Sequence, residues 1–148
     1  MVDINYPLRK AYIAKLASLE YESTPVKVFY QMVPDSIATA SETLYVVIDS
    51  INSNNISTTN SQDLSATVTI TVHSYGNKYS NGRAVDNITG QILGLVCTSP
   101  AETFDLSSDN LQAVSNTLES DNINSFTTQG NRMYIDRVVR ISHNIFLK

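Results

Sequence analysis

The feature that most constrains the fold is the long segment 132–147 (RMYIDRVVRISHNIFL), in which apolar and polar residues alternate. A repeat of two residues is typical of a β-strand with one buried face. The usual strand is about 5–6 residues long. This one is therefore expected to extend beyond its own sheet and contact a neighbouring chain or element. Its apolar parity holds Met133, Ile135, Val139, Ile141, Ile145 and Leu147.

A second segment, 64–75 (LSATVTITVHSY), alternates almost as strictly. Apolar residues occupy one parity and hydroxyl-bearing residues the other, which predicts a half-buried antiparallel strand. We expect a neighbouring element or subunit to cover the polar side, and we predict an oligomer interface there. That side is formed by Thr67, Thr69, Thr71 and His73.

Shorter strands are predicted from β-branched and aromatic content at about 26–30, 44–51 and 111–118. The segment 44–51 (LYVVIDSI) is almost entirely apolar, which favours a central strand buried on both faces. Polar, turn-rich stretches predict extended loops or connections at 31–42, 52–62 and 120–131.

Helical spacing of apolar residues predicts two helices, at about 7–20 and 83–96. Asn5 is a candidate cap for the first helix, and Ser80 or Asn81 for the second. The second helix contains two interior glycines, each about 1 kcal/mol less favourable there than Ala. We expect close packing of the helix on the sheet to explain them. They are Gly90 and Gly94.

The order of these elements predicts an α+β fold: an antiparallel β-sheet packed with two α-helices and joined by extended loops. With 148 residues, 42% of them hydrophobic and 16% charged, the chain is expected to form a single domain, 1–148, with its own core. The net charge of −4 argues against a nucleic-acid reader, which normally carries a basic patch.

Cys97 is the only cysteine, so no disulfide can form within the chain and a reducing compartment is expected. The first residues, MVDINYPLRK, lack the apolar stretch of a secretion signal, and no apolar run is long enough to cross a bilayer. We therefore expect no membrane association and a chain that is soluble in the cytoplasm where it is made.

The two histidines, His73 and His143, would need to converge with Asp49, Asp136 or Cys97 to bind a metal ion, and no local spacing favours this. His143 shares the apolar parity of its strand, which indicates a hydrogen-bonded core or sheet-edge residue. No catalytic motif or phosphate loop is present. We therefore expect no catalytic residue, no cofactor, no metal and no enzymatic activity.

Three arginines, Arg132, Arg137 and Arg140, lie in the last predicted strand. Arg137 falls on the apolar parity and Arg140 on the polar one, so they cannot form one flat basic face. Interleaved with Asp136, they are predicted to form ion pairs at an oligomer interface and not to track phosphates.

The order of features resembles the tail terminator family of tailed bacteriophages, also called tail completion proteins. An aromatic residue followed by a proline closes a strand at 30–34, and a strand leads through Ser-Tyr and a polar turn into a helix at 72–88. The loops 31–42 and 52–62 exceed the pattern of the family. The matching stretches are PLRKAYIAKL, VKVFYQMVP, LYVVIDSI, VHSYGNKYSNGRAVDNITGQILGLV and MYIDRVVRISHNIF.

The resemblance implies a structural virion protein that forms a homo-oligomeric ring, typically sixfold, with twelvefold as an alternative. Such a ring ends the tail or joins it to the portal and connector, and genomic DNA passes through its lumen. Its expected partners are copies of itself and the portal, connector and tail proteins, in the host cytoplasm during assembly and then in the neck or tail of the virion.

Two other kinds of protein stay open on the residues alone. One is a small intracellular adaptor or binding module, which would remain monomeric. The other is an enzyme whose site lies between subunits and uses His73 or His143.

Overall fold

The structure, a computed structural model, describes residues 3–38, 40–55, 63–79, 82–127 and 132–147. Its helices are α1 (Asn5–Leu16), α2 (Asp35–Ala38) and α3 (Arg83–Val96), with 3₁₀ turns η1 (Asn77–Tyr79), η2 (Ala101–Thr103) and η3 (Ser107–Asp109). Its strands are β1 (Glu20–Tyr21), β2 (Thr24–Pro25), β3 (Lys27–Tyr30), β4 (Thr43–Asn55), β5 (Asp63–Tyr75), β6 (Leu111–Thr127) and β7 (Met133–Leu147).

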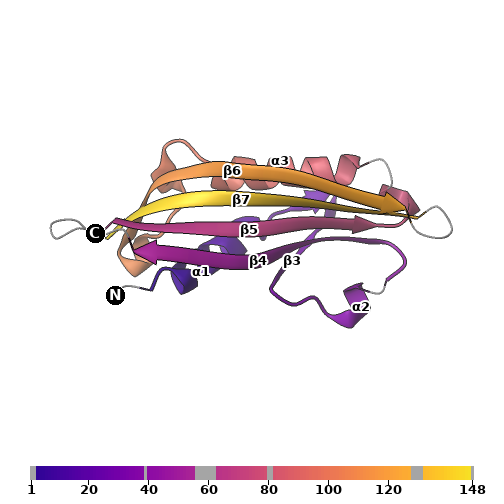
Figure 1. Ribbon diagram of the computed structural model, residues 1–148, viewed down its shortest axis with the longest axis horizontal. Coiled ribbons are helices and arrows are strands. Elements are labelled where there is room, and N and C mark those ends of the chain that lie inside the picture. Colours follow the sequence, from indigo (N-terminus) through magenta and orange to yellow (C-terminus); the bar gives the residue numbers. More distant parts are fainter. Residues whose placement is uncertain (1–2, 39, 56–62, 80–81, 128–131, 148) are drawn as a thin grey trace.

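The main sheet has the strand order β3-β4-β5-β7-β6, and β1 and β2 form a separate short hairpin. Figure 1 shows a long, gently curved sheet with α1 and α3 packed behind it. The α+β fold with two covering helices is therefore confirmed. The predicted antiparallel pairing holds for β4, β5, β7 and β6, whereas β3 pairs with β4 in parallel.

The parallel pair needs a crossover, because parallel neighbours cannot be joined by a tight hairpin. The stretch 31–42 supplies it and contains the short helix α2, so the prediction of a plain loop is wrong in part. The loop predicted at 52–62 is wrong for its first four residues, because β4 continues to Asn55. Positions 56–62 lie outside the described residues.

The core lies between the helices and one face of the sheet. Alternate residues of β5 are buried there, and Ile70 at its centre is paired with Ile48 of β4 and Val139 of β7. From the other layer, α3 buries Ile88 and Ile92. Each such side chain contributes about 1.5–3 kcal/mol when it leaves water, so this layer contact is a main source of stability.

The strand predicted at 44–51 is buried on both faces over only part of its length. Val46, Val47 and Ile48 are consecutive and buried, whereas Asp49 is exposed. The register shifts between Ile48 and Ser50, where β3 no longer pairs with β4. The prediction is thus confirmed for the centre of the strand only.

The last two strands are both long. β7 spans almost the whole predicted segment 132–147. β6 is much longer than the predicted 111–118, because it continues through most of the stretch predicted as a connection, 120–131, and ends at Thr127. Its far half is polar because both of its faces are exposed there, and Asn122, Ile123 and Asn124 are all open to solvent.

The helix termini differ from their predicted positions. α1 begins at Asn5 and ends at Leu16, short of residue 20, so Asn5 lies inside the helix and does not cap it. The carboxylate of Asp3 instead accepts a hydrogen bond from the backbone N–H of Asn5 at 2.9 Å. The predicted caps Ser80 and Asn81 lie outside the described residues.

The two glycines of α3 do not pack closely against the sheet. Gly90 and Gly94 are exposed, and a Cβ atom added at either position would meet no atom within 4 Å. The predicted close approach is therefore wrong. In the described part of the chain, no helix is long and apolar enough to span a membrane.

Candidate functional site: the uncovered face of the sheet

The face of the sheet opposite α1 and α3 has no helix over it in the described part of the chain (Figure 1). We call this the open face. Thr67, Thr69 and Thr71 of β5 lie on it, half-buried between neighbouring strands, and His73 follows them at its end. The structure thus places these four sequence-predicted residues on one surface, away from the core.

One end of the open face carries a cluster of aromatic rings, which we call the aromatic cluster. His73 lies between Tyr45 of β4 and Asp136 of β7 in the sheet register. Its ring centre is 4.8 Å from that of Tyr45 and 5.8 Å from that of Tyr134. Tyr134 stacks on Tyr75 with the ring centres 4.1 Å apart. These tyrosines were not singled out from the sequence, although Tyr75 and Tyr134 share the polar parity of their strands.

Within the aromatic cluster, Nδ1 of His73 is hydrogen-bonded to a carboxylate oxygen of Asp136. The pair fixes the orientation of the imidazole, because the carboxylate holds one ring nitrogen in place. In the described residues the ring makes no other hydrogen bond, so no hydroxyl or thiol is paired with it as a nucleophile would be. The His73–Asp136 pair therefore orients an imidazole on the surface, and among the described residues it is not part of a catalytic triad.

Asp49 brings a second carboxylate to this end of the face and accepts a hydrogen bond from the hydroxyl of Thr71. Partial burial raises the pKa of Asp49, and the nearby charge of Asp136 raises it further. His73 and Asp136 thus converge as a metal site would require. Among the described residues, however, no group of three or more His, Cys, Asp or Glu side chains is close enough together to hold a metal ion.

His143 lies on the opposite side of the sheet and is fully buried. Asn116 donates to the carbonyl of Ala101 at 3.0 Å, so its oxygen accepts from Nδ1–H of His143 at 2.7 Å. The Nε2 atom is then the acceptor for the hydroxyl of Tyr12. Burial lowers the pKa of His143 to about 4, so the ring is neutral. The predicted hydrogen-bonded core histidine is confirmed.

The arginines of the last predicted strand lie on different faces of the sheet, as the alternation predicted for Arg137 and Arg140. Arg140 is exposed on the open face and has no ion-pair partner in the part of the chain that the structure describes. Arg132 lies beside the aromatic cluster, 5.9 Å from the ring centre of Tyr75, and donates to the carbonyl of Ser41 at 2.9 Å.

Arg137 lies on the helix side of the sheet. Its guanidinium forms two hydrogen bonds with Asp121 of β6, at 2.9 and 2.6 Å, and one with Asp86 of α3, at 2.8 Å. The paired guanidinium lowers the pKa of Asp121. Arg137 therefore ties three elements of one subunit together, whereas the predicted role at an oligomer interface stays a prediction for all three arginines.

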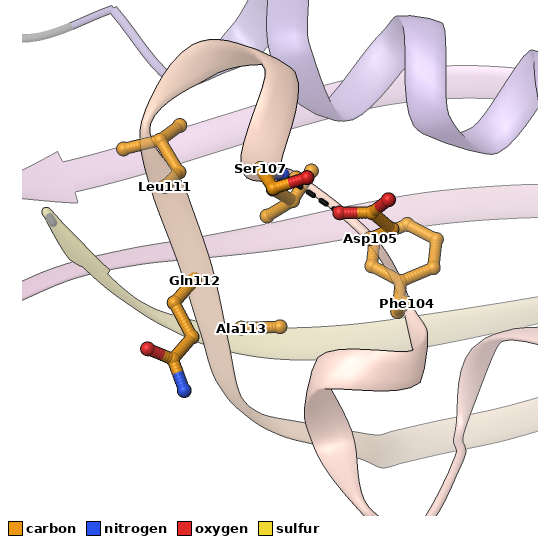
Figure 2. A pocket seen from close by; sticks show the side chains of 7 residues that line it. Phe104, Asp105, Ser107, Leu111, Gln112 and Ala113 are labelled. Carbon is orange, nitrogen blue, oxygen red and sulfur yellow. Dashed lines mark hydrogen bonds between the residues drawn. The ribbon is translucent and has the colours of Figure 1, made fainter.

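Two cavities beside the sheet are small. One of about 110 Å³ lies where η3 meets β6, and Figure 2 shows its lining residues Phe104, Asp105 and Leu111 around the turn. The backbone N–H of Ser107 donates to Asp105 across this turn at 2.8 Å. A second cavity of about 220 Å³ lies between β3, β4 and the crossover that contains α2. Ligand pockets usually measure about 300–1,000 Å³, so neither cavity has the size of a small-molecule site.

Comparison with known proteins gives matches to solved structures but none in sequence. No protein-family model matches the chain, and no curated protein matches it in sequence. The fold is similar to a chain of a solved structure described as "Virion of native gene transfer agent (GTA) particle", with a TM-score of 0.48 and 11% identity. The match covers 94% of this chain and 90% of that chain. A similarity at this level supports no conclusion about function.

Proposed function

We propose that this protein is a structural component of a phage virion, which forms a homo-oligomeric ring in the neck or tail. The ring ends the tail or joins it to the portal and connector, and genomic DNA passes through its lumen. The family resemblance of the sequence suggests this role. The observation that supports it most is the open face, a broad sheet surface with no helix over it in the described part of the chain.

The residues of the open face suit contact with protein. Aromatic residues and Arg are enriched at protein interfaces, and Lys and Glu are depleted. The face presents Tyr45, Tyr75, Tyr134 and Arg140 beside hydroxyl and amide groups. Its carboxylates Asp49 and Asp136 are each hydrogen-bonded within the subunit. A subunit can therefore cover this face without burying many uncompensated charges. We place Thr67, Thr69, Thr71, His73 and Arg140 at the subunit contact, with Arg132 at its rim and Arg137 behind it as a support.

The charge of the chain agrees with DNA that passes without being held. Binding to DNA strengthens with the number of phosphates that Lys and Arg neutralise. With a net charge of −4, a ring of such subunits offers few neutralising contacts. DNA is thus a neighbour of the ring in this proposal and not its ligand.

Electron microscopy of the purified protein, alone and mixed with portal, connector and tail proteins, tests this function. We expect closed rings of one size, with sixfold symmetry first and twelvefold as the alternative. A protein that stays monomeric in every mixture and in phage particles contradicts the proposal and favours an adaptor module.

The alternative of an enzyme with an intersubunit site now concerns His73 only, because the ring of His143 is buried and both of its nitrogens are hydrogen-bonded. The His73–Asp136 pair is the observation that would favour it. A hydrolytic activity that His73→Ala abolishes, while ring formation persists, would support the enzyme. Unchanged activity in that variant would remove it.

A further inference from the structure

The sheet ends in two different open edges. On one side, the whole outer edge of β6 (Leu111–Thr127) has no strand partner among the described residues. On the other side, β3 pairs only with positions Tyr45–Ile48 of β4. The remaining half of β4, Asp49–Asn55, therefore also lacks a strand partner on its outer side within the described residues. We call these the β6 edge and the β4 edge.

Unpaired edges of this length are unusual, because they offer free backbone donors and acceptors to any other strand. The β6 edge also exposes apolar side chains: Val114 is 59% exposed, Leu118 38% and Ile123 56%. Natural proteins normally keep an edge strand short, place charges on it or cover it with another element, so that it does not pair with other chains. The strand thus has the character of a surface that is covered in the assembled protein.

The directions of the strands allow the two edges to meet. β4 is antiparallel to β5, β5 to β7, and β7 to β6, so β6 runs opposite to β4. If a second copy is placed beside the first in the same orientation, its β4 edge runs antiparallel to the β6 edge of the first. In the row register of one subunit, residues 113–120 of β6 lie opposite residues 50–55 of the neighbour's β4, so the antiparallel ladder continues there. Residues 121–124 of β6 fall in the rows that β3 already occupies and take no part in it.

We propose that copies of this chain associate head to tail by pairing the β6 edge of one subunit with the β4 edge of the next. This inference rests on the proposed ring and names the contact that builds it. Because the two edges differ, the contact is heterologous, and repeated rotation by a constant angle closes it into a ring. Pairing of two β6 edges would instead give a twofold dimer that cannot grow.

Cysteine cross-linking distinguishes these arrangements. Asn52 of β4 and Thr117 of β6 lie in the same row of the sheet, through Thr67 and Ser142, and both are exposed. In a background of Cys97→Ser, we make Asn52→Cys and Thr117→Cys, separately and together, and treat each with a short bismaleimide. Head-to-tail pairing predicts a dimer only when the two single variants are mixed, and a ladder of multimers for the double variant.

A charge on the edge provides the second measurement. Val114→Lys places a solvated ammonium on the β6 edge, between the rows of Asn54 and Asn55 of β4, and we expect it to reduce the oligomeric fraction at least tenfold in sedimentation. Ile13→Lys is the matched control, because Ile13 is 47% exposed and lies on helix α1, on neither edge. It should leave the oligomer unchanged.

The outcomes separate this inference from the proposed function. Rings that form without the mixed cross-link, and that tolerate Val114→Lys, overturn the edge pairing and leave the ring proposal in place. A cross-link within Thr117→Cys alone overturns it in favour of the twofold dimer. Head-to-tail ladders that electron microscopy shows as open filaments support the edge pairing and contradict the ring. Monomers under all conditions contradict both.

Discussion

At the scale of single residues, the two histidines have opposite environments although both lie in central strands. His73 pairs with a carboxylate on the open face, whereas His143 is enclosed by Tyr12, Phe104 and Asn116. Both nitrogens of His143 have partners that suit the neutral ring, so a proton cannot be added without breaking a bond to Tyr12. The fold is therefore built around an uncharged imidazole.

The first prediction follows from this enclosure. The pKa of His143 is lowered from 6.5 in the unfolded chain to about 4 in the folded one, so the unfolded chain takes up the proton first. The contribution of the neutral ring is complete above about pH 6.5 and is lost as the pH falls toward 4. The loss amounts to about 3 kcal/mol of unfolding free energy.

Urea unfolding across this pH range measures the effect against the variant His143→Gln. The difference in unfolding free energy between the two proteins should shrink as the pH falls, because only the wild type has this ring to protonate. Parallel pH profiles would show that His143 is not the group responsible. His73 is present in both proteins and cancels from the comparison.

At the scale of elements, one face of α3 carries a continuous apolar stripe, whereas no other described element packs against the helix at the two glycines of its outer face. Ile88 and Ile92 are fully buried, while Gly90 and Gly94 face solvent. The glycines therefore weaken the helix without a packing reason in the single subunit. In contrast, Gly82 before the helix has a φ of 74°, which favours glycine strongly.

The second prediction compares these positions. Gly90→Ala should raise the unfolding free energy by about 0.5–1 kcal/mol, because Ala has less backbone freedom to lose and its methyl group meets no atom. Gly82→Ala, the matched change at a left-handed position, should lower it by about 1 kcal/mol. Thermal and urea unfolding check both signs. A destabilised Gly90→Ala variant would mean that something does approach this face.

Also at this scale, strand identity could be predicted wherever one face is buried, as in β5 and β7. The far half of β6 could not, because neither of its faces meets the helices and no apolar alternation marks it. The parallel pairing of β3 was equally hidden. It depends on the path of the crossover through α2. The residue pattern within β3 carries no information about that path.

At the scale of the whole molecule, assembly should depend on the open face more than stability does. Arg140 is exposed there and makes no ion pair in the described part of the chain, so the isolated subunit should not need it. Reversal of its charge, Arg140→Glu, should weaken assembly, with an effect that grows at low salt. Unfolding should change by no more than about 0.5 kcal/mol.

Light scattering and urea unfolding of the same samples provide this test. Lys78→Glu is the control, because it makes the same change of charge at another exposed position, outside the open face. If both variants assemble like the wild type, Arg140 is not at the subunit contact. If both fail equally, net charge and not the site is responsible.

The sequence by itself determined the strands and helices that bury one face, and which parity of each is buried, because these follow from the spacing of apolar residues along a few turns or pleats. Only the tertiary structure decided which segments meet. His73 and Asp136, and Tyr12 and His143, are far apart in the chain and become partners through strand register and helix placement. Such pairings minimise buried unsatisfied groups over the whole molecule, which no local pattern records.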